Sequence, residues 1–170
     1  MEQSMIEEYF PTGIASGSTF LGREEESQHL TDNLARGRHT LLLSPRRYGK
    51  TSLVKNVIKK MNLISQEIDL FLATDETAIE RKILKGAKSL INALSQTPNQ
   101  WFKELLGYFQ KANKKWSIGI KGLGLELEPE NHHDIPDNIL EALNAVETVL
   151  AKKQQKAVFF IDEIQEIAQL

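Results

Sequence analysis

The sequence lacks cysteine, long apolar runs and any large excess of charge of one sign. None of its 170 residues is a cysteine, which excludes a disulfide framework, a thiolate metal site and a cysteine nucleophile. No stretch approaches the roughly 18 consecutive apolar residues of a membrane-spanning helix. The start of the chain is acidic and lacks the basic-then-apolar profile of a secretory signal. We therefore expect a cytoplasmic protein with no membrane segment.

The charge is close to balanced, with 21 Lys and Arg against 23 Asp and Glu, a net charge of −2. This balance argues against nucleic-acid binding by bulk charge, although a local basic patch stays possible. Hydrophobic residues make up 41% and charged residues 26%, an ordinary globular composition. The length suits one domain spanning residues 1–170, with residues 1–22 as a lead-in whose second half is rich in Gly, Ser, Thr and Pro.

Apolar patterns divide the chain into alternating strands and helices, as in an α/β fold. Short apolar runs predict buried strands over residues 39–43, 67–72 and 157–161. Helical spacing predicts helices over residues 24–36, 53–61, 75–95, 99–113 and 136–153, with the start of another after residue 163. The first strand, its helix and the second strand fill about 30 residues, the size of a βαβ unit.

Residues 114–128 change to the period of a β-hairpin. Trp116, Ile118 and Ile120 alternate with small or polar residues, and the alternation resumes after Gly122. A turn at Lys121-Gly122 would give a hairpin inserted into the α/β core, with one apolar face. The expected pairs are Ile120 with Leu123, Ile118 with Leu125 and Trp116 with Leu127.

The strongest functional pattern is a phosphate-binding loop between a predicted strand and a predicted helix. The segment SPRRYGKT fits G-x-x-x-x-G-K-[ST] except that Ser44 replaces the first glycine. Loop and first-turn N–H groups would bind phosphate oxygens, Gly49 would let the backbone approach, Lys50 would bridge the terminal phosphates, and Thr51 would help to hold Mg²⁺. The residues assigned to the nucleotide here are Ser44, Pro45, Arg46, Arg47, Tyr48, Gly49, Lys50, Thr51 and Ser52.

A second pattern places two carboxylates after an apolar strand, in VFFIDE. Ligands of parallel α/β sheets bind at the carboxyl ends of the strands. There Asp162 suits the Mg²⁺ shell, usually through water, and Glu163 suits polarising the water that attacks the γ-phosphate. Lys50 and Glu163 are therefore the predicted catalytic residues of an ATPase that uses ATP and Mg²⁺.

Three segments, FLGREEE at 20–26, SPRRYGKTSL at 44–53 and FFIDEIQEI at 159–167, together resemble the AAA+ ATPases, in particular their archaeal-type ATPase branch. The resemblance covers about residues 10–74 and 155–167. It implies an αβα nucleotide-binding core in which Phe20, Leu21, Gly22 and Arg23 help to line the adenine pocket.

The same resemblance implies further parts beyond Glu163. In the AAA+ fold, a strand with a polar sensor residue follows the acidic strand and lies between it and the phosphate-loop strand; an arginine finger and a helical lid come later. Seven residues follow Glu163. We expect the N-terminal part of an ATPase domain, or a sheet completed by another copy, with weak nucleotide binding and slow hydrolysis.

Several other residues have two interpretations each. Arg46 and Arg47 fit contacts to phosphate or a neighbouring subunit, and equally a solvated loop. His132, His133 and Asp134 read as metal ligands or, more in keeping with adjacent histidines in a polar loop, as exposed side chains. Trp101 and Trp116 could stack on bases, but their spacing favours packing.

The leading hypothesis is an ATPase in which hydrolysis drives a conformational change. One alternative is a nucleotide-dependent switch or scaffold that hydrolyses little and engages a protein partner through the 114–128 hairpin. Another is a DNA- or RNA-acting motor, which the net charge does not favour. The partner protein is not named by the sequence, and association between copies is possible.

Overall fold

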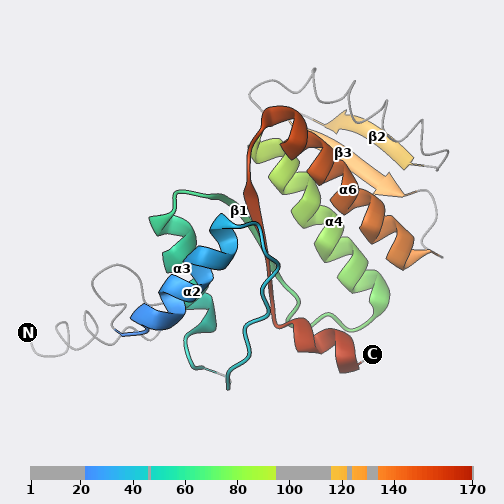
Figure 1. The fold of residues 1–170 in the computed structure, drawn as a ribbon. Helices are drawn as coiled ribbons and strands as arrows, with labels where there is room; N and C mark the ends of the chain where they lie inside the picture. Colours follow the sequence, from blue (N-terminus) through green and yellow to red (C-terminus); the bar gives the residue numbers. More distant parts are fainter. Residues whose placement is uncertain (1–21, 46, 95–115, 122–123, 130–133, 170) are drawn as a thin grey trace, which may run out of the picture. The chain divides into compact units, whose positions relative to one another are not determined.

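The computed structural model describes residues 22–45, 47–94, 116–121, 124–129 and 134–169. Over these residues the protein is α/β, with four α-helices, a two-stranded parallel sheet and a separate antiparallel pair (Figure 1). The chain forms two units, a first unit of Met1–Leu63 and a second unit of Ile64–Leu170. None of the described helices is long and apolar enough to cross a membrane.

The first unit contains helices α2 (Glu24–Ala35) and α3 (Lys50–Lys60), which contact each other. The predicted helix at 24–36 is confirmed. Acidic side chains occupy the first turn of α2, where they complement the helix dipole, and Gly37 follows its end with φ of 68°. One side of α3 is buried, as its spacing predicts; the buried side chains are Ser52, Leu53, Val54, Val57 and Ile58.

The strand predicted at residues 39–43 is wrong. The segment has no regular secondary structure, and Leu41 and Leu43 are 66% and 84% exposed. An apolar run favours burial, but a strand also needs a neighbouring strand to pair its N–H and C=O groups. The described residues of the first unit contain no other strand, so the expected βαβ unit and its larger parallel core sheet are absent there.

The sheet of the second unit pairs β1 (Ile64–Asp69) with β4 (Ala157–Asp162) in parallel, from Ile64 opposite Ala157 to Asp69 opposite Asp162. The β4 prediction is confirmed. The predicted strand at 67–72 lies three residues too far along the chain, because β1 ends where β4 ends. Beyond it, Phe71 and Leu72 are 44% and 73% exposed, and Leu72 has left the extended conformation with φ of 60°.

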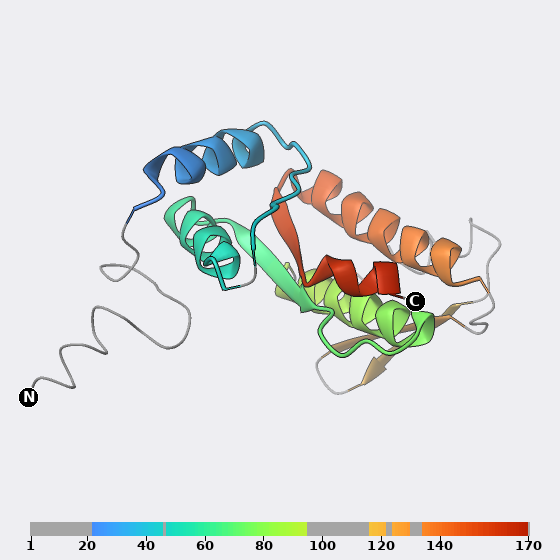
Figure 2. The same ribbon diagram turned by 90° about the horizontal axis from the view of Figure 1, so that it is seen from below.

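Helices α4 (Glu76–Ala93) and α6 (Ile135–Lys153) lie side by side on one side of this sheet (Figures 1 and 2). Both were predicted: Asp75 caps α4 by accepting from the Ala78 N–H at 2.7 Å, and Pro136 lies in the first turn of α6. The largest core cluster is formed between these helices by Leu84, Ala87, Leu90, Ile91, Leu94, Ala142, Ala145, Val146 and Val149.

Polar contacts join the same two helices. The fully buried Glu80 accepts a hydrogen bond of 2.6 Å from the side-chain amide of Asn138. At the other end, the Lys153 ammonium donates to the carbonyl of Leu94, just past α4. A paired buried carboxylate fixes the helices at one register, because any slip would leave it without its partner.

The hairpin is confirmed, as strands β2 (Trp116–Lys121) and β3 (Gly124–Pro129) in their own antiparallel sheet. Its register differs from the expected one by two residues: Ile118 lies opposite Leu127 and Trp116 opposite Pro129. The Trp116 indole N–H donates to the Glu141 carboxylate at 2.7 Å, which holds the hairpin to α6. The helix predicted over 99–113 lies outside the described residues.

Candidate functional site

The loop between residues 44 and 49 leads directly into the N-terminus of α3. Pro45 C=O accepts from the Tyr48 N–H at 3.4 Å, which closes a turn, and Gly49 C=O accepts from the Leu53 N–H at 2.9 Å as the helix begins. The expected order of loop, glycine and helix is therefore present, without the expected strand before it.

Gly49 is the N-cap residue of α3 and has φ of 70° and ψ of 25°, in the left-handed region. A side chain at this position would strain the backbone, whereas space is not limiting, since a Cβ built at Gly49 meets no atom within 4 Å. Arg47 is also left-handed, with φ of 64°. Because glycine carries no side chain, no capping side chain from residue 49 covers the positive end of the helix.

Lys50 bends back over the loop that precedes it. Its ammonium donates to the carbonyl of Ser44 at 3.0 Å and to that of Pro45 at 3.3 Å. These two neutral acceptors hold the positive charge beside the loop and the helix N-terminus. A phosphate oxygen is a stronger, charged acceptor for the same donor, so this position of Lys50 is suited to receive an anion.

The other predicted nucleotide-binding residues of the first unit lie before α2, in the exposed loop and in the first turn of α3. Arg47 and Tyr48 are exposed. Arg23 is the N-cap of α2 and, like Gly22 before it, is left-handed, with φ of 65° for Arg23 and 76° for Gly22. Phe20, Leu21 and Arg46 lie outside the described residues. Thr51 and Ser52 lie in the first turn of α3, half-buried and buried.

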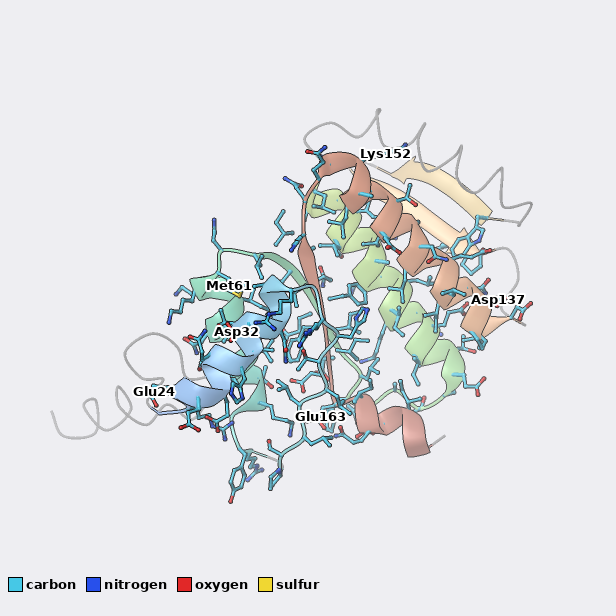
Figure 3. The ribbon with its side chains drawn as sticks, viewed as in Figure 1. Glu24, Asp32, Met61, Asp137, Lys152 and Glu163 are labelled. Atoms are coloured by element: carbon cyan, nitrogen blue, oxygen red, sulfur yellow. The ribbon has the colours of Figure 1, made fainter. Side chains whose placement is uncertain are left out.

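In the second unit, Asp162 and Glu163 lie at the carboxyl end of β4, where Glu163 is labelled in Figure 3. Asp162 is held twice: its carbonyl accepts from the Leu70 N–H at 3.1 Å, and its Oδ1 accepts from the Glu163 N–H at 3.0 Å. Glu163 is left-handed, with φ of 55°, and turns the chain from β4 into the 3₁₀-helix η2 (Ile164–Gln169). The Gln165 amide donates to its carboxylate.

A third carboxylate at this sheet end, Asp69, was missed by the sequence reasoning. It is the last residue of β1 and the register partner of Asp162, and residues paired in a parallel sheet direct their side chains to the same face. Its Oδ1 accepts from the Phe71 N–H at 2.8 Å, while the Lys82 ammonium of α4 donates to the carbonyls of Asp69 and Phe71 at 2.8 and 3.0 Å. The signal was present as an Asp within EIDLFL, but the strand was predicted to run past it.

The side chains that could ligate a metal indicate which type of ion would fit. Among the described residues no group of three or more His, Asp or Glu side chains is arranged to hold an ion, and His132 and His133 lie outside them. Mg²⁺ differs from zinc or calcium because it keeps several waters and takes only one or two protein ligands besides phosphate. A hydroxyl such as Thr51 and a carboxylate such as Asp162 are oxygen ligands of the type that Mg²⁺ takes.

Comparison of the chain with known protein families, with curated proteins and with solved structures gave no match.

Proposed function

We propose that this chain binds Mg-ATP through residues 44–52 and hydrolyses it with Glu163. The observation that carries the proposal is the left-handed Gly49 leading into α3 with the Lys50 ammonium turned back over the loop. The sequence pattern of a phosphate-binding loop and this local geometry both favour an anion at the start of α3.

When phosphate binds, the Lys50 ammonium would exchange neutral carbonyl acceptors for charged phosphate oxygens, which are stronger acceptors. Lys50 would leave the carbonyls of Ser44 and Pro45 for oxygens of the terminal phosphates, and the N–H groups of the first turn would add the field of the helix dipole. The side chain need only rotate, since its Cα is fixed by the first turn of α3.

Bound Mg²⁺ would neutralise developing charge on the phosphates. Thr51 and Asp162 are the residues that would hold it, Asp162 through water. Glu163 would accept a proton from the attacking water, and the Gln165 amide already orients its carboxylate.

We also propose that the chain is an AAA+ P-loop ATPase of the archaeal-type branch. In that assignment Phe20, Leu21, Gly22 and Arg23 line the adenine side, and hydrolysis drives a conformational change in a protein partner. The support is the sequence resemblance of the three segments, together with the α/β architecture.

Calorimetric titration with Mg-ATP tests the binding step. Lys50→Ala should weaken affinity roughly tenfold to a hundredfold, because it removes charge-assisted hydrogen bonds worth about 1.5–3 kcal/mol. Lys60→Ala is the matched control, since Lys60 is exposed in the last turn of the same helix, and should bind as the parent does. Equal affinity of parent and Lys50→Ala would contradict the phosphate-loop assignment.

Hydrolysis separates the ATPase from the alternative of a nucleotide switch. Glu163→Gln should keep Mg-ATP affinity within about threefold and lower kcat by about 10²–10⁴, the contribution of a positioned general base. Multiple-turnover phosphate release measures this. A turnover number unchanged by Glu163→Gln would exclude Glu163 as the base, and a parent that binds without turnover would favour the switch.

A further inference from the structure

One exposed face of α4 carries positive charge only. Arg81, Lys85 and Lys88 follow one another at spacings of four and three residues, so at 3.6 residues per turn they lie within about 60° of arc on the helix surface. Arg81 and Lys85 are exposed and Lys88 is half-buried. We call these three residues the α4 basic stripe.

The carboxylates of α4, a helix described at every residue, lie away from this stripe. Glu76 is in the first turn on another side of the helix, and Glu80 is fully buried against Asn138. Lys82 adds a fourth positive charge beside the stripe while its ammonium binds the carbonyls of Asp69 and Phe71. Arg81 and Lys85 are thus exposed, Lys82 and Lys88 are half-buried beside them, and no acidic residue of the helix lies between these four cations.

A helix face that serves only solubility usually mixes the two signs of charge. The exposed positions of α6, by contrast with the stripe, include Asp137, Glu147 and Lys152, and Figure 3 shows Asp137 and Lys152 at opposite ends of that helix. A single-sign stripe in a chain of net charge −2 concentrates a local positive potential. The net charge does not cancel it, because exposed charges beyond about 10 Å are screened at 0.1 M salt.

Polar side chains continue the stripe toward the C-terminus of α4. Ser89 and Asn92 are half-buried and lie on or beside the same face. Arg, Lys, Ser and Asn are the side chains that commonly donate to phosphate oxygens of nucleic acids. From residue 81 to residue 92 the face extends about 16 Å along the helix axis, the length of about five phosphates of one strand at 3.4 Å each.

We propose that the α4 basic stripe binds the phosphate backbone of a nucleic acid, without reading its sequence. The stripe presents donors and cations and no base-stacking aromatic side chain of its own, which is the composition of backbone contact rather than base recognition. The contact is independent of the nucleotide site proposed above, because none of its residues belongs to that site.

Fluorescence polarisation of a labelled duplex DNA tests this surface. With about three cations engaged, the parent chain should bind at about 50 mM salt with a Kd of roughly 10⁻⁴ to 10⁻⁶ M, weakening steeply as salt rises. The double variant Arg81→Gln, Lys85→Gln should lose at least about tenfold in affinity and lower the salt slope by about two. Glutamine keeps the helix propensity of Arg and Lys, and circular dichroism checks that the fold is retained.

The matched control is Lys59→Gln, Lys60→Gln on α3, which removes the same charge from two exposed helical positions. It should leave the affinity within about twofold. Equal loss in the two double variants would overturn the proposal, since binding would then follow net charge alone. So would a parent that does not bind DNA, or one that binds poly-glutamate of equal charge as tightly, which would indicate an acidic protein partner.

Discussion

Gly86 of α4 packs against Ile68 and Phe159 of the sheet that carries Asp162, so replacing it by alanine tests that packing directly. A Cβ built at Gly86 would lie 2.6 Å from Ile68 Cδ1, 2.7 Å from Ile68 Cγ1 and 3.3 Å from Phe159 Cζ. Ordinary contacts between carbon atoms are about 3.5–4.0 Å. Ile68 is 4% exposed, so its side chain cannot swing out into solvent to make room.

Two opposing effects decide the outcome. Alanine gains about 1 kcal/mol over glycine in a helix interior, whereas forcing a methyl group into a packed core costs about 1–3 kcal/mol. Because both Ile68 atoms are well inside contact distance and β-branched side chains are stiff, we expect the clash to win. Gly86→Ala should lower the free energy of unfolding by about 1 kcal/mol. Ser89→Ala, at a half-buried position of the same helix, gains propensity without this clash and should be neutral or slightly stabilising.

A double-mutant cycle tests whether the clash with Ile68 causes the loss of stability in Gly86→Ala. Ile68→Ala alone should cost about 2–5 kcal/mol by leaving a cavity. In Gly86→Ala, Ile68→Ala the new methyl group enters the space that Ile68 vacates, so the double variant should be at least about 1 kcal/mol more stable than the sum of the single effects predicts.

Urea unfolding followed by far-UV circular dichroism measures each free energy, with the m-value as a check that the unfolded and folded states are unchanged. A Gly86→Ala variant stabilised by the full helix-propensity gain, or additive effects in the cycle, would refute this contact between α4 and β1.

Two further predictions concern the polar contacts of the second unit. Asp75→Ala should destabilise the protein by about 1 kcal/mol in the same unfolding assay, because the Ala78 N–H loses its acceptor. Asp75→Ser should recover most of this loss, since serine also caps helices. Equal stability of the two variants would refute the cap. Trp116→Phe removes the donor to Glu141 and should cost about 1.5–3 kcal/mol, the range for a hydrogen bond to a charged group. A loss no larger with Glu141 present than in a Glu141→Ala background, which has no acceptor, would refute that contact.

The helices were predictable because their signals are local. The Asp75 cap, the Pro136 start of α6 and the spacing of apolar residues in α4 are each contained in one turn or one face of a helix. The strand β4 was predictable from its apolar run. The first-unit strand was not, since burial pattern says nothing about whether a neighbouring strand exists to pair with residues 39–43.

In the hairpin, the alternation of apolar residues predicts the strands but not their register. Alternation identified both strands, but a shift of two residues leaves every side chain on the same face, so the hydrophobic pattern fits both registers equally. Ile118 was expected opposite Leu125 and lies opposite Leu127. In the same way Asp69 became a neighbour of Asp162 through the register of β1 and β4, which no local pattern in the sequence specifies.

The candidate site also has features that the sequence predicts and features that it does not. The left-handed Gly49, the helix beginning at Lys50 and the acidic end of β4 follow from motif residues at fixed spacing. The bonds from Lys50 to the carbonyls of Ser44 and Pro45 depend on how the loop folds back, which spacing alone does not determine.

The most direct test of nucleotide binding at this loop is a ¹H–¹⁵N correlation spectrum of the 170-residue chain titrated with Mg-ATP. We predict that the largest saturable shifts fall on the amides of Gly49, Lys50 and Thr51, with further shifts at Asp162 and Glu163, and that they vanish in Lys50→Ala at the same nucleotide concentration. Saturable shifts that leave residues 44–52 unchanged, or none at millimolar Mg-ATP, would contradict the account.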